Sequence, residues 1–206
     1  MKILTIAANK GGVGKTTLSS LIACEAIKYG LEVFIIDTDP QQSLKRWWEK
    51  RVDEKIKYID AEKKRLVDLP SNIKKTPGLL IIDTPPSHLK IIEDAIKLAD
   101  YILIPCRPSP LDIEAIGETI TVVEELKKNF AFVINSAISG TKVTEQALLL
   151  LSRYGPIAPS IIRQRTVYAT SMTDGRSALE MNNKLVKEES NILWNFLTKK
   201  MRLNNG

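Results

Sequence analysis

Short apolar runs rich in isoleucine, leucine and valine alternate along the chain with longer stretches whose apolar residues recur at helical spacing. Continuous apolar runs of this length are typical of strands buried on both faces of a parallel sheet. The predicted strands cover residues 3–8, 33–36, 79–82, 101–104 and 130–134. The predicted helices cover residues 16–29, 89–99, 111–129 and 143–154. The alternation predicts an α/β fold with a mostly parallel, twisted sheet and helices on both faces.

The size and composition of the chain fit one soluble domain. The sequence has 206 residues, of which 44% are hydrophobic and 26% are charged, and a domain typically has roughly 150 residues. This hydrophobic content excludes the disordered and fibrous classes. No internal repeat, low-complexity tract or flexible linker divides the sequence. We therefore expect a single domain spanning residues 1–206.

Cysteine usage and hydropathy point to the cytoplasm. Cys24 and Cys106 are too few to build a disulfide framework, and their spacing does not resemble a metal site. No uncharged apolar stretch approaches the ~18 residues that a membrane-spanning helix needs. The first apolar run leads into Asn9, Lys10 and a glycine-rich loop, which is not the pattern of a signal peptide. We expect a cytoplasmic protein with two free thiols.

The glycine-rich loop, residues 9–17, lies between the first predicted strand and the first predicted helix. Glycines let consecutive N–H groups point inward, and the helix amino terminus adds partial positive charge, so this arrangement binds phosphates. Lys15 is expected to reach the β- and γ-phosphates, and the Thr16 hydroxyl to ligate Mg²⁺. Thr17 is placed to contact the α-phosphate. The nucleotide-binding residues predicted in the loop are Gly11, Gly12, Val13, Gly14, Lys15, Thr16 and Thr17.

Three aspartates follow two of the other predicted strands. Asp37 and Asp39 come after the strand at 33–36, and Asp83 comes after the strand at 79–82. The carboxyl ends of parallel strands form the crevice in which open α/β sheets bind ligands. Asp83 has the form of a Walker B acid, which typically holds Mg²⁺ through water. The predicted magnesium site therefore consists of Thr16, Asp37 and Asp83.

The loop departs from the general phosphate-loop pattern because Asn9 stands where that pattern has glycine, and a second lysine, Lys10, follows. This variant resembles the deviant Walker A loop of the ParA/MinD group. The resemblance covers nearly the whole chain and is greatest for the ParA family of partition ATPases, specifically its small ParF-like members that lack an amino-terminal DNA-binding domain. It implies a three-layer P-loop NTPase fold. Its carriers are residues 10–17, 37–41, 83–86, 99–100, 104–105 and 108–112.

The resemblance also implies roles for single residues in an ATP-dependent homodimer whose two nucleotides lie face to face. Lys10 would cross to the nucleotide phosphates of the other subunit, and Asp39 would position the attacking water. The implied catalytic residues are thus Lys10, Lys15 and Asp39. Asn135 matches a position that hydrogen-bonds adenine, although asparagine at a strand end is also an ordinary turn former.

Two further segments match the family near its nucleotide. Pro108 belongs to a loop, 105–112, that should pack near the base and the dimer contact. Residues 161–165 and Tyr168 match a family loop near the nucleotide only loosely, and no role beyond DNA or partner contact is assigned to them.

The function implied by the resemblance is slow, Mg²⁺-dependent hydrolysis of ATP that segregates plasmid or chromosome DNA. The ATP-bound dimer would bind DNA without sequence preference, and thus associate with the nucleoid. A ParB-like or small centromere-binding protein would stimulate hydrolysis, often by supplying an arginine, which can raise the rate of phosphoryl transfer by ~10³ or more. Asp39 is the one evident general base of the predicted site.

Two related functions stay open at this stage. A MinD-like ATPase cycles on membranes through a short amphipathic carboxyl-terminal helix, but the apolar residues Leu185, Ile192, Leu193, Phe196 and Leu197 are more simply explained by a last helix docked on the sheet. We therefore expect no stable membrane association. A ParA-like positioner of a non-DNA cargo shares every motif named above. An iron–sulfur protein of the nitrogenase type is disfavoured, because neither cysteine has the setting of a cluster ligand.

The basic charge of the chain is concentrated in two segments. The formal net charge is +6; residues 45–75 carry +5 and residues 184–206 carry +3. Solvent-exposed helix faces explain such runs as well as a polyanion partner does. Beside an ATP-gated dimer, however, the segments become candidate DNA surfaces that double on dimerisation. The preferred DNA contacts are Lys184, Lys187, Lys199, Lys200 and Arg202.

Overall fold

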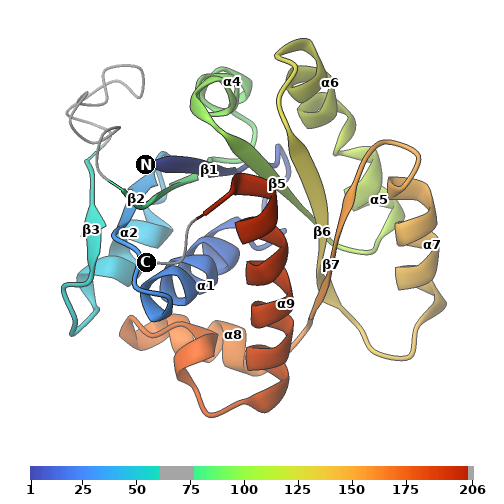
Figure 1. Cartoon of the computed structure of the whole chain (residues 1–206). Coiled ribbons are helices and arrows are strands. Elements are labelled where there is room, and N and C mark those ends of the chain that lie inside the picture. Colours follow the sequence, from blue (N-terminus) through green and yellow to red (C-terminus); the bar gives the residue numbers. More distant parts are fainter. Residues whose placement is uncertain (61–76, 204–206) are drawn as a thin grey trace.

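Seven parallel strands form one sheet in the computed structural model, which describes residues 1–60 and 77–203 (Figure 1). Their order is β3-β2-β4-β1-β5-β6-β7, and each neighbouring pair is parallel. The strands are β1 (Lys2–Ile6), β2 (Val33–Asp37), β3 (Ile56–Tyr58), β4 (Leu79–Asp83), β5 (Tyr101–Cys106), β6 (Phe130–Ala137) and β7 (Ile157–Arg163). The predicted parallel α/β architecture is confirmed.

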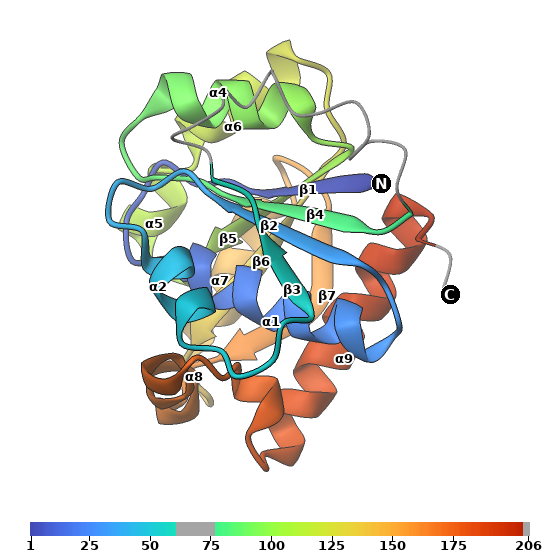
Figure 2. The same cartoon turned by 90° about the vertical axis from the view of Figure 1, so that its left-hand side faces the viewer.

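Helices cover both faces of the sheet (Figures 1 and 2). The helices α1 (Lys15–Lys28), α2 (Ser43–Glu49), α8 (Thr166–Ser171) and α9 (Lys184–Met201) lie on one face. The other face carries α4 (Leu89–Leu98), α5 (Pro110–Glu114), α6 (Gly117–Glu125) and α7 (Lys142–Leu151). Two short 3₁₀ helices, Met172–Asp174 and Ala178–Glu180, connect α8 to α9.

The central strands show why the sequence reads as continuous apolar runs. In β1, Leu4 and Ile6 pack with α1 and α9, whereas Ile3 packs on the opposite face beside α4. In β4, Leu79 and Ile81 join the first of these clusters, and Leu80 and Ile82 join the second. Successive side chains of a strand point to opposite faces. Because both faces are buried, the inner residues of β1 and β4 are apolar except Thr5, whose hydroxyl donates to the carbonyl oxygen of Ala95, until Asp83 ends β4 at the ligand-binding edge.

Two predicted elements have different boundaries in the structure. The first strand ends at Ile6, two residues before the predicted end, because the chain already turns into the phosphate loop. The helix predicted over 111–129 is two helices, α5 and α6. The break falls directly before Gly117, and glycine has the lowest helix propensity of any residue except proline. Because of this break, Asp112 lies on a short helix of its own, α5, and not on α6.

Strands β3 and β7 were not among the sequence predictions. Strand β3 has three residues and lies at one edge of the sheet, so its apolar pattern is too short to detect. Strand β7 lies at the other edge and contains Pro159, Ser160 and Arg163. Proline is tolerated in edge strands because one side of such a strand has no ladder partner. A mixed polar sequence with proline does not resemble a buried strand.

Helix α9 docks on the sheet, as predicted, but through a partly different face. Val186, Trp194 and Met201 are buried together with the predicted Leu193 and Leu197. Two residues assigned to the apolar stripe, Leu185 and Ile192, are instead 54% and 45% exposed. The large indole of Trp194 stacks on Tyr29, the C-cap residue of α1, with ring centroids 5.6 Å apart. No helix in the described part of the chain is long and apolar enough to span a membrane.

The segment between α8 and α9 is fixed to α2. The guanidinium group of Arg51, just after α2, forms ion pairs with Glu180 and Asp53 and donates a hydrogen bond of 2.9 Å to the carbonyl oxygen of Gly175. Gly175 has a φ of 77°, and a Cβ at this position would lie 2.5 Å from the backbone carbon of Lys50. The indole N–H of Trp47 donates to the carbonyl oxygen of Arg176 at 2.9 Å.

Candidate functional site

The phosphate loop joins the carboxyl end of β1 to the amino end of α1. Gly14 is the N-cap of α1 and has a φ of 92°, in the left-handed region that glycine adopts without strain. A Cβ at Gly14 would lie 2.0 Å from the side-chain nitrogen of Asn135. Gly12 also has a positive φ of 74°. The glycines at these positions let the loop lie tightly against the end of β6.

Lys15 is held inside the loop. The residue is 6% exposed, and its ammonium group donates hydrogen bonds of 3.0 Å to the carbonyl oxygens of Ala8 and Lys10. Burial lowers the pKa of Lys15, and the charges of Asp83 and Asp39 oppose this shift in part. The loop thus presents a desolvated cation, which strengthens its attraction for an anion such as phosphate.

Thr16 and Asp83 meet at the start of α1. The Thr16 hydroxyl donates a hydrogen bond of 2.7 Å to Oδ2 of Asp83. Oδ1 of the same carboxylate is buried and has no hydrogen-bond partner within the described residues. Burial, together with repulsion from Asp37, raises the pKa of Asp83 to about 8. A hydroxyl oxygen beside an orphaned carboxylate oxygen is a donor set that suits Mg²⁺, so the residues present fit this ion.

Asp37 organises the loop that carries Asp39. Its Oδ1 accepts a hydrogen bond of 2.9 Å from the Asp39 N–H. Its Oδ2 accepts from the N–H groups of Leu44 and Lys45, at 2.8 and 3.1 Å. Burial raises the pKa of Asp37, and these three hydrogen bonds act against the shift. The carboxylate therefore caps the start of α2, and its role in holding Mg²⁺ stays a prediction.

Lys10 and Asn9 contact the α5–α6 region. The Lys10 ammonium lies 3.8 Å from Oδ1 of Asp112 in the first turn of α5. The Asn9 side chain donates a hydrogen bond to Glu118, and the Asn9 N–H donates to the Thr119 hydroxyl at 3.2 Å. In the single chain, the two residues that distinguish this loop from the general pattern are thus bound to a neighbouring element of the same subunit.

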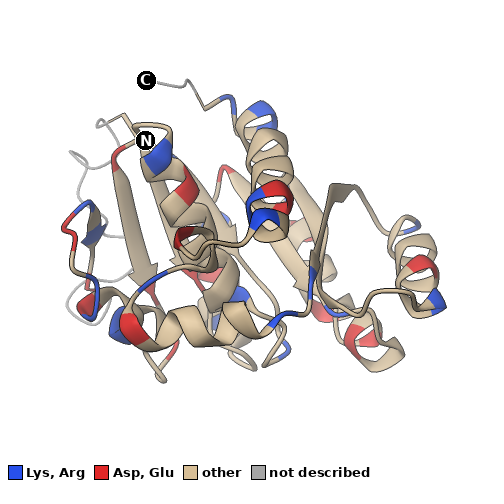
Figure 3. Cartoon of the chain, turned by 90° about the horizontal axis from the view of Figure 1, so that it is seen from below, with Lys and Arg blue, Asp and Glu red and all other residues tan. Residues whose placement is uncertain are grey.

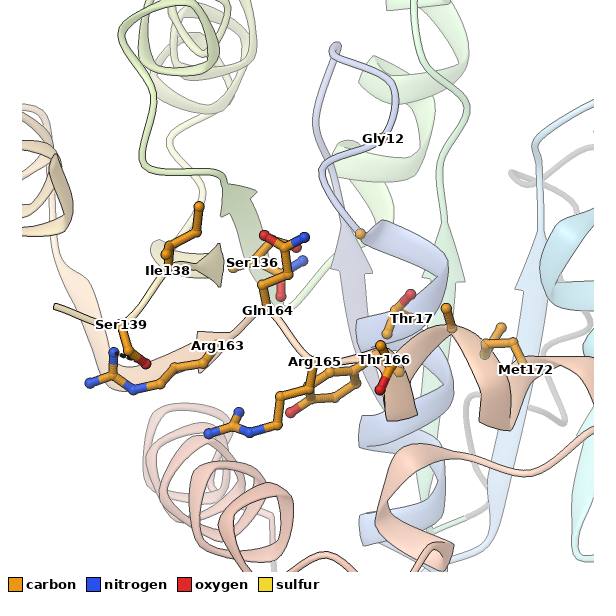
Figure 4. Close-up of a pocket in the computed structure, with 14 residues that line it drawn as sticks. Gly12, Thr17, Ser136, Ile138, Ser139, Arg163, Gln164, Arg165, Thr166 and Met172 are labelled. Carbon is orange, nitrogen blue, oxygen red and sulfur yellow. Dashed lines mark hydrogen bonds between the residues drawn. The ribbon is translucent and has the colours of Figure 1, made fainter. Parts of the chain in front are cut away.

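A cavity of about 750 Å³ opens beside the loop, between the ends of β6 and β7 (Figure 4). Asn135, 4% exposed, lies at its edge and donates a hydrogen bond of 2.6 Å to the carbonyl oxygen of Val13. The close-up shows Thr17 and Gly12 toward one side and Arg163, Gln164 and Arg165 toward the other. The lining residues are Gly12, Gly14, Thr17, Asn135, Ser136, Ile138, Ser139, Arg163, Gln164, Arg165, Thr166, Tyr168, Ala169 and Met172.

Pro108 lies on an adjoining cavity of about 420 Å³. This second cavity shares Ser136, Ile138 and Gln164 with the larger one. Of the predicted nucleotide-binding residues outside the phosphate loop, Asn135 thus borders the larger cavity and Pro108 the smaller one. Whether either contacts a base stays a prediction.

The sequence did not single out most of the far wall of the larger cavity. The wall comes from β7 and α8, and β7 was not detected as a strand. The loose family match at 161–165 and Tyr168 was the available signal, and the structure places Arg163, Gln164, Arg165 and Tyr168 on the cavity. Met172, whose sulfur accepts a hydrogen bond of 3.4 Å from Ser20, carried no signal at all.

The five basic residues proposed as DNA contacts lie on α9 or just after it, and all five are exposed (Figure 3). Lys184 and Lys187 are near its start, and Lys199, Lys200 and Arg202 near its end. At 1.5 Å per residue, roughly 20 Å of helix separates the two groups. The structure therefore does not gather them into one patch. Much of the other basic segment, 45–75, lies outside the described residues.

Both cysteines are buried free thiols, as expected. Burial raises the pKa of each to about 12.

Comparison with protein families places this site in a known class. Residues 4–178 match the CobQ/CobB/MinD/ParA nucleotide-binding domain. The chain belongs to this family. The match includes the phosphate loop, Asp83 and most of the lining of the larger cavity, and it ends before α9.

Relatives of known name fall within the same family. The maintenance of carboxysome distribution protein A of Halothiobacillus neapolitanus is 30% identical over 86% of this chain and 87% of its own length. Protein ParA of Rhizobium radiobacter is 26% identical over 89% of this chain and 88% of its own length.

Solved structures share the fold. An ATP complex of a McdA variant from Cyanothece superposes with a TM-score of 0.81 at 18% identity, covering 99% of this chain and 97% of that chain. The MinD cell division protein of Aquifex aeolicus superposes with a TM-score of 0.79 at 21% identity, covering 97% of each chain. The predicted P-loop NTPase-like fold and the family resemblance are confirmed.

Proposed function

We propose that this protein is a ParA-type ATPase that hydrolyses ATP slowly in a nucleotide-bridged homodimer, binds DNA without sequence preference in its ATP form, and segregates plasmid or chromosome DNA. The observation that carries the proposal is the arrangement of Lys15, Thr16 and Asp83 where the phosphate loop meets the end of β4, beside Thr17, which lines the large cavity. The buried ammonium of Lys15 and the neighbouring unpartnered carboxylate oxygen of Asp83 are suited to a nucleoside triphosphate with its divalent cation.

The residues of the loop bind and orient the substrate. Lys15 donates to the β- and γ-phosphates, and the N–H groups of residues 11–17 surround them at the start of α1. The Thr16 hydroxyl would ligate Mg²⁺, and the Asp83 and Asp37 carboxylates would hold the ion through water. When bound, the ion neutralises charge that develops on the phosphates. Asp39, on the loop shaped by Asp37, orients the water that attacks the γ-phosphate.

Lys10 acts between subunits. The Lys10 side chain is 38% exposed, and its ammonium forms one ion pair, at 3.8 Å, with Asp112. Asp112 also accepts a hydrogen bond from the Ser109 hydroxyl, so Lys10 can exchange Asp112 for a phosphate of a second subunit without leaving that carboxylate unpartnered. A dimer that uses Lys10 in this way forms with ATP and dissociates after hydrolysis.

Intrinsic turnover is slow because the site has phosphate-binding groups and metal ligands but no evident strong general base besides Asp39. A centromere-binding partner of ParB-like or smaller type accelerates the reaction by supplying an arginine. The resulting cycle releases the protein from DNA at the cargo. In the cell, the ATP form is associated with the nucleoid and the ADP form is free in the cytoplasm.

An electrophoretic mobility shift experiment tests the DNA function. Random-sequence duplex DNA is mixed with the protein and ATP, ADP or no nucleotide, at two salt concentrations. Retention only with ATP, weakening steeply with salt, is expected, because binding to phosphates releases counterions. A variant in which Lys199, Lys200 and Arg202 are replaced by glutamine is expected to lose retention. Equal retention with ADP would contradict the proposed cycle.

A second candidate function is the positioning of a non-DNA cargo by the same ATPase cycle. The observation that favours it is the 30% identity to a carboxysome distribution protein. The two functions differ in the partner that stimulates hydrolysis. ATPase assays with the purified products of neighbouring genes distinguish them, since stimulation by a DNA-binding protein supports DNA segregation and stimulation by a protein without DNA affinity supports the second candidate.

A MinD-like membrane cycle has less support from the structure. The apolar face of α9 is packed against β7 and α1, and that helix therefore does not supply a free amphipathic anchor. Sedimentation with anionic liposomes in the presence of ATP tests this alternative. Retention by vesicles and not by DNA would replace the proposed function.

A further inference from the structure

One carboxylate on α9 binds the far wall of the nucleotide cavity. Oε2 of Glu189 accepts hydrogen bonds from the Arg165 guanidinium at 2.7 Å, the Tyr168 hydroxyl at 3.2 Å and the Arg163 N–H at 3.3 Å. All three donors belong to residues that line the larger cavity. They come from the end of β7, the N-cap of α8 and the body of α8, so a single side chain fixes the whole turn.

The contact is shielded from solvent and is anchored at both ends. The side chains of Glu189 and Arg165 are 13% and 17% exposed. The Ser160 hydroxyl on β7 also donates a hydrogen bond of 2.7 Å to the carbonyl oxygen of Glu189. Hydrogen bonds to charged groups are stronger than neutral ones, and they are electrostatically stronger where they are shielded from water. Residue 189 is thereby tied to the cavity wall through both its backbone and its side chain.

The same helix carries Lys184 and Lys187 on its solvent side, and Glu188, which is next to Glu189, points away from the wall and forms an ion pair with Lys184. Because Glu189 joins the β7–α8 turn to α9, a displacement of that turn acts directly on the first half of α9. Ser190, Leu193 and Trp194 continue the buried face beyond that point.

We propose that Glu189 is a positioning residue that holds the β7–α8 wall of the larger cavity and connects the occupancy of that cavity to α9. This inference deepens the proposed function, and it rests on the cavity being the nucleotide site. Arg165 and Tyr168 are oriented for the ligand by Glu189, and ligand contact with either residue is transmitted to the helix whose start carries two of the basic residues.

Glu189→Gln tests the positioning role, with Glu188→Gln as the matched control one residue away. Both changes remove one negative charge from α9. Isothermal titration calorimetry with ADP is expected to show about tenfold weaker binding for E189Q, since a hydrogen bond to a charged group is worth roughly 1.5 kcal/mol or more, and an unchanged affinity for E188Q. In steady-state assays, E189Q should raise KM for ATP and leave kcat unchanged.

Hydrogen exchange tests the connection to α9. In the wild type, ADP is expected to increase amide protection over residues 184–194, and this increase should persist in E188Q and vanish in E189Q at saturating ADP. A merely structural role for Glu189 would lower the protection of α9 with and without ADP by the same amount, which would overturn the connection. Wild-type affinity in E189Q would overturn the positioning role.

Two controls separate this inference from other failures. Tyr168→Phe keeps Glu189 and the aromatic ring but removes one donor, and it is expected to weaken ADP binding about two- to fivefold; this variant replaces E189Q in the test if E189Q does not fold. Absence of ADP binding by the wild type would refute the proposed function and this inference together, whereas normal ADP binding by Y168F or by folded E189Q refutes the inference alone.

Discussion

The ammonium group of Lys15 donates a hydrogen bond of 3.0 Å to the carbonyl oxygen of Lys10. The two lysines of the phosphate loop are therefore joined through a backbone contact, while their charged ends differ in position. The ammonium of Lys15 lies inside the loop, and that of Lys10 extends to the buried Asp112 in the first turn of α5. This divergence gives the two residues separable roles.

Replacement of each lysine is expected to have a different effect. Lys15→Ala removes the cation at the centre of the loop, and ATP affinity should fall by about 100-fold, the equivalent of one strong charge-assisted contact. Lys10→Gln should change ATP affinity by less than about threefold but abolish ATP-dependent dimerisation and partner-stimulated hydrolysis. Calorimetry and analytical ultracentrifugation measure both. Equal loss of ATP binding in the two variants would contradict the role of Lys10 between subunits.

Asp39→Ala is expected to trap an ATP-bound dimer. The Asp39 N–H donates to Asp37, and the Asp39 carboxylate accepts a hydrogen bond of 2.8 Å from the Gln41 N–H. Loss of a general base typically lowers the rate by about 10²–10⁴. Size-exclusion chromatography with ATP should show a stable dimer, and phosphate release should be lost. Asp174→Asn, an exposed aspartate paired with Arg176, serves as the control. Wild-type turnover by D39A would assign the general base to another residue.

The Arg51–Glu180 ion pair predicts a pH-dependent stability. Burial opposes the ionisation of Glu180, but hydrogen bonds from Arg51 and from the Ser177 N–H outweigh it and lower the pKa of Glu180. A lowered folded-state pKa stabilises the fold above the unfolded value of 4.5, and this contribution is lost as the pH falls below it. At pH 7, Glu180→Gln should cost about 1–2 kcal/mol, discounted for the partial exposure of Glu180.

Thermal denaturation between pH 3.5 and 8 measures this effect. The melting temperature of E180Q should lie about 2–8 °C below that of the wild type at pH 7. The difference should shrink below pH 4.5, as the pH falls through the lowered pKa of Glu180, because the wild-type carboxylate then becomes protonated and loses its charge. Glu188→Gln controls for the loss of one surface carboxylate. A difference that is constant with pH would show that the charge of Glu180 is not what stabilises the segment.

Gly175→Ala and Gly30→Ala form a matched pair. Both glycines have a positive φ, 77° and 80°, so alanine is strained at each position. An added Cβ meets nothing within 4 Å at Gly30 but lies 2.5 Å from the Lys50 backbone at Gly175. Overpacking typically costs about 1–3 kcal/mol, so G175A should melt lower than G30A by about 2–12 °C. Equal melting temperatures would mean that the α2 contact yields without cost.

The parallel sheet and the phosphate site were readable from the sequence because each depends on local pattern. Strands β1, β2, β4, β5 and β6 are buried on both faces, and their apolar runs are continuous apart from Thr5 in β1. Thr16 and Asp83 were placed in one site because both follow central parallel strands, and the ends of such strands meet at one edge. Their hydrogen bond confirms that they are adjacent.

The far wall of the cavity depends on contacts that no local pattern encodes. The β7 edge strand interrupts its apolar pattern with Pro159 and Ser160, and the carboxylate that fixes the wall, Glu189, comes from a different helix. The buried face of α9 was misassigned in part because Trp194 packs against Tyr29, a partner that lies far away in sequence. Helical spacing predicts that a helix has an apolar face. Which residues of that face are buried depends on how the helix is rotated about its axis, and this rotation is set by the surface on which it packs.

The chain has three tryptophans, and their positions make the protein its own optical probe. Trp47 and Trp48 lie on α2, which starts directly after the loop of Asp39, and the Trp48 indole stacks on Tyr58 with centroids 5.2 Å apart. Trp194 lies on α9, beyond Glu189. Emission from unlabelled protein therefore reports on both helices, and Trp194→Phe isolates the signal of α2. Stopped-flow mixing with ATP can follow the two helices separately in time.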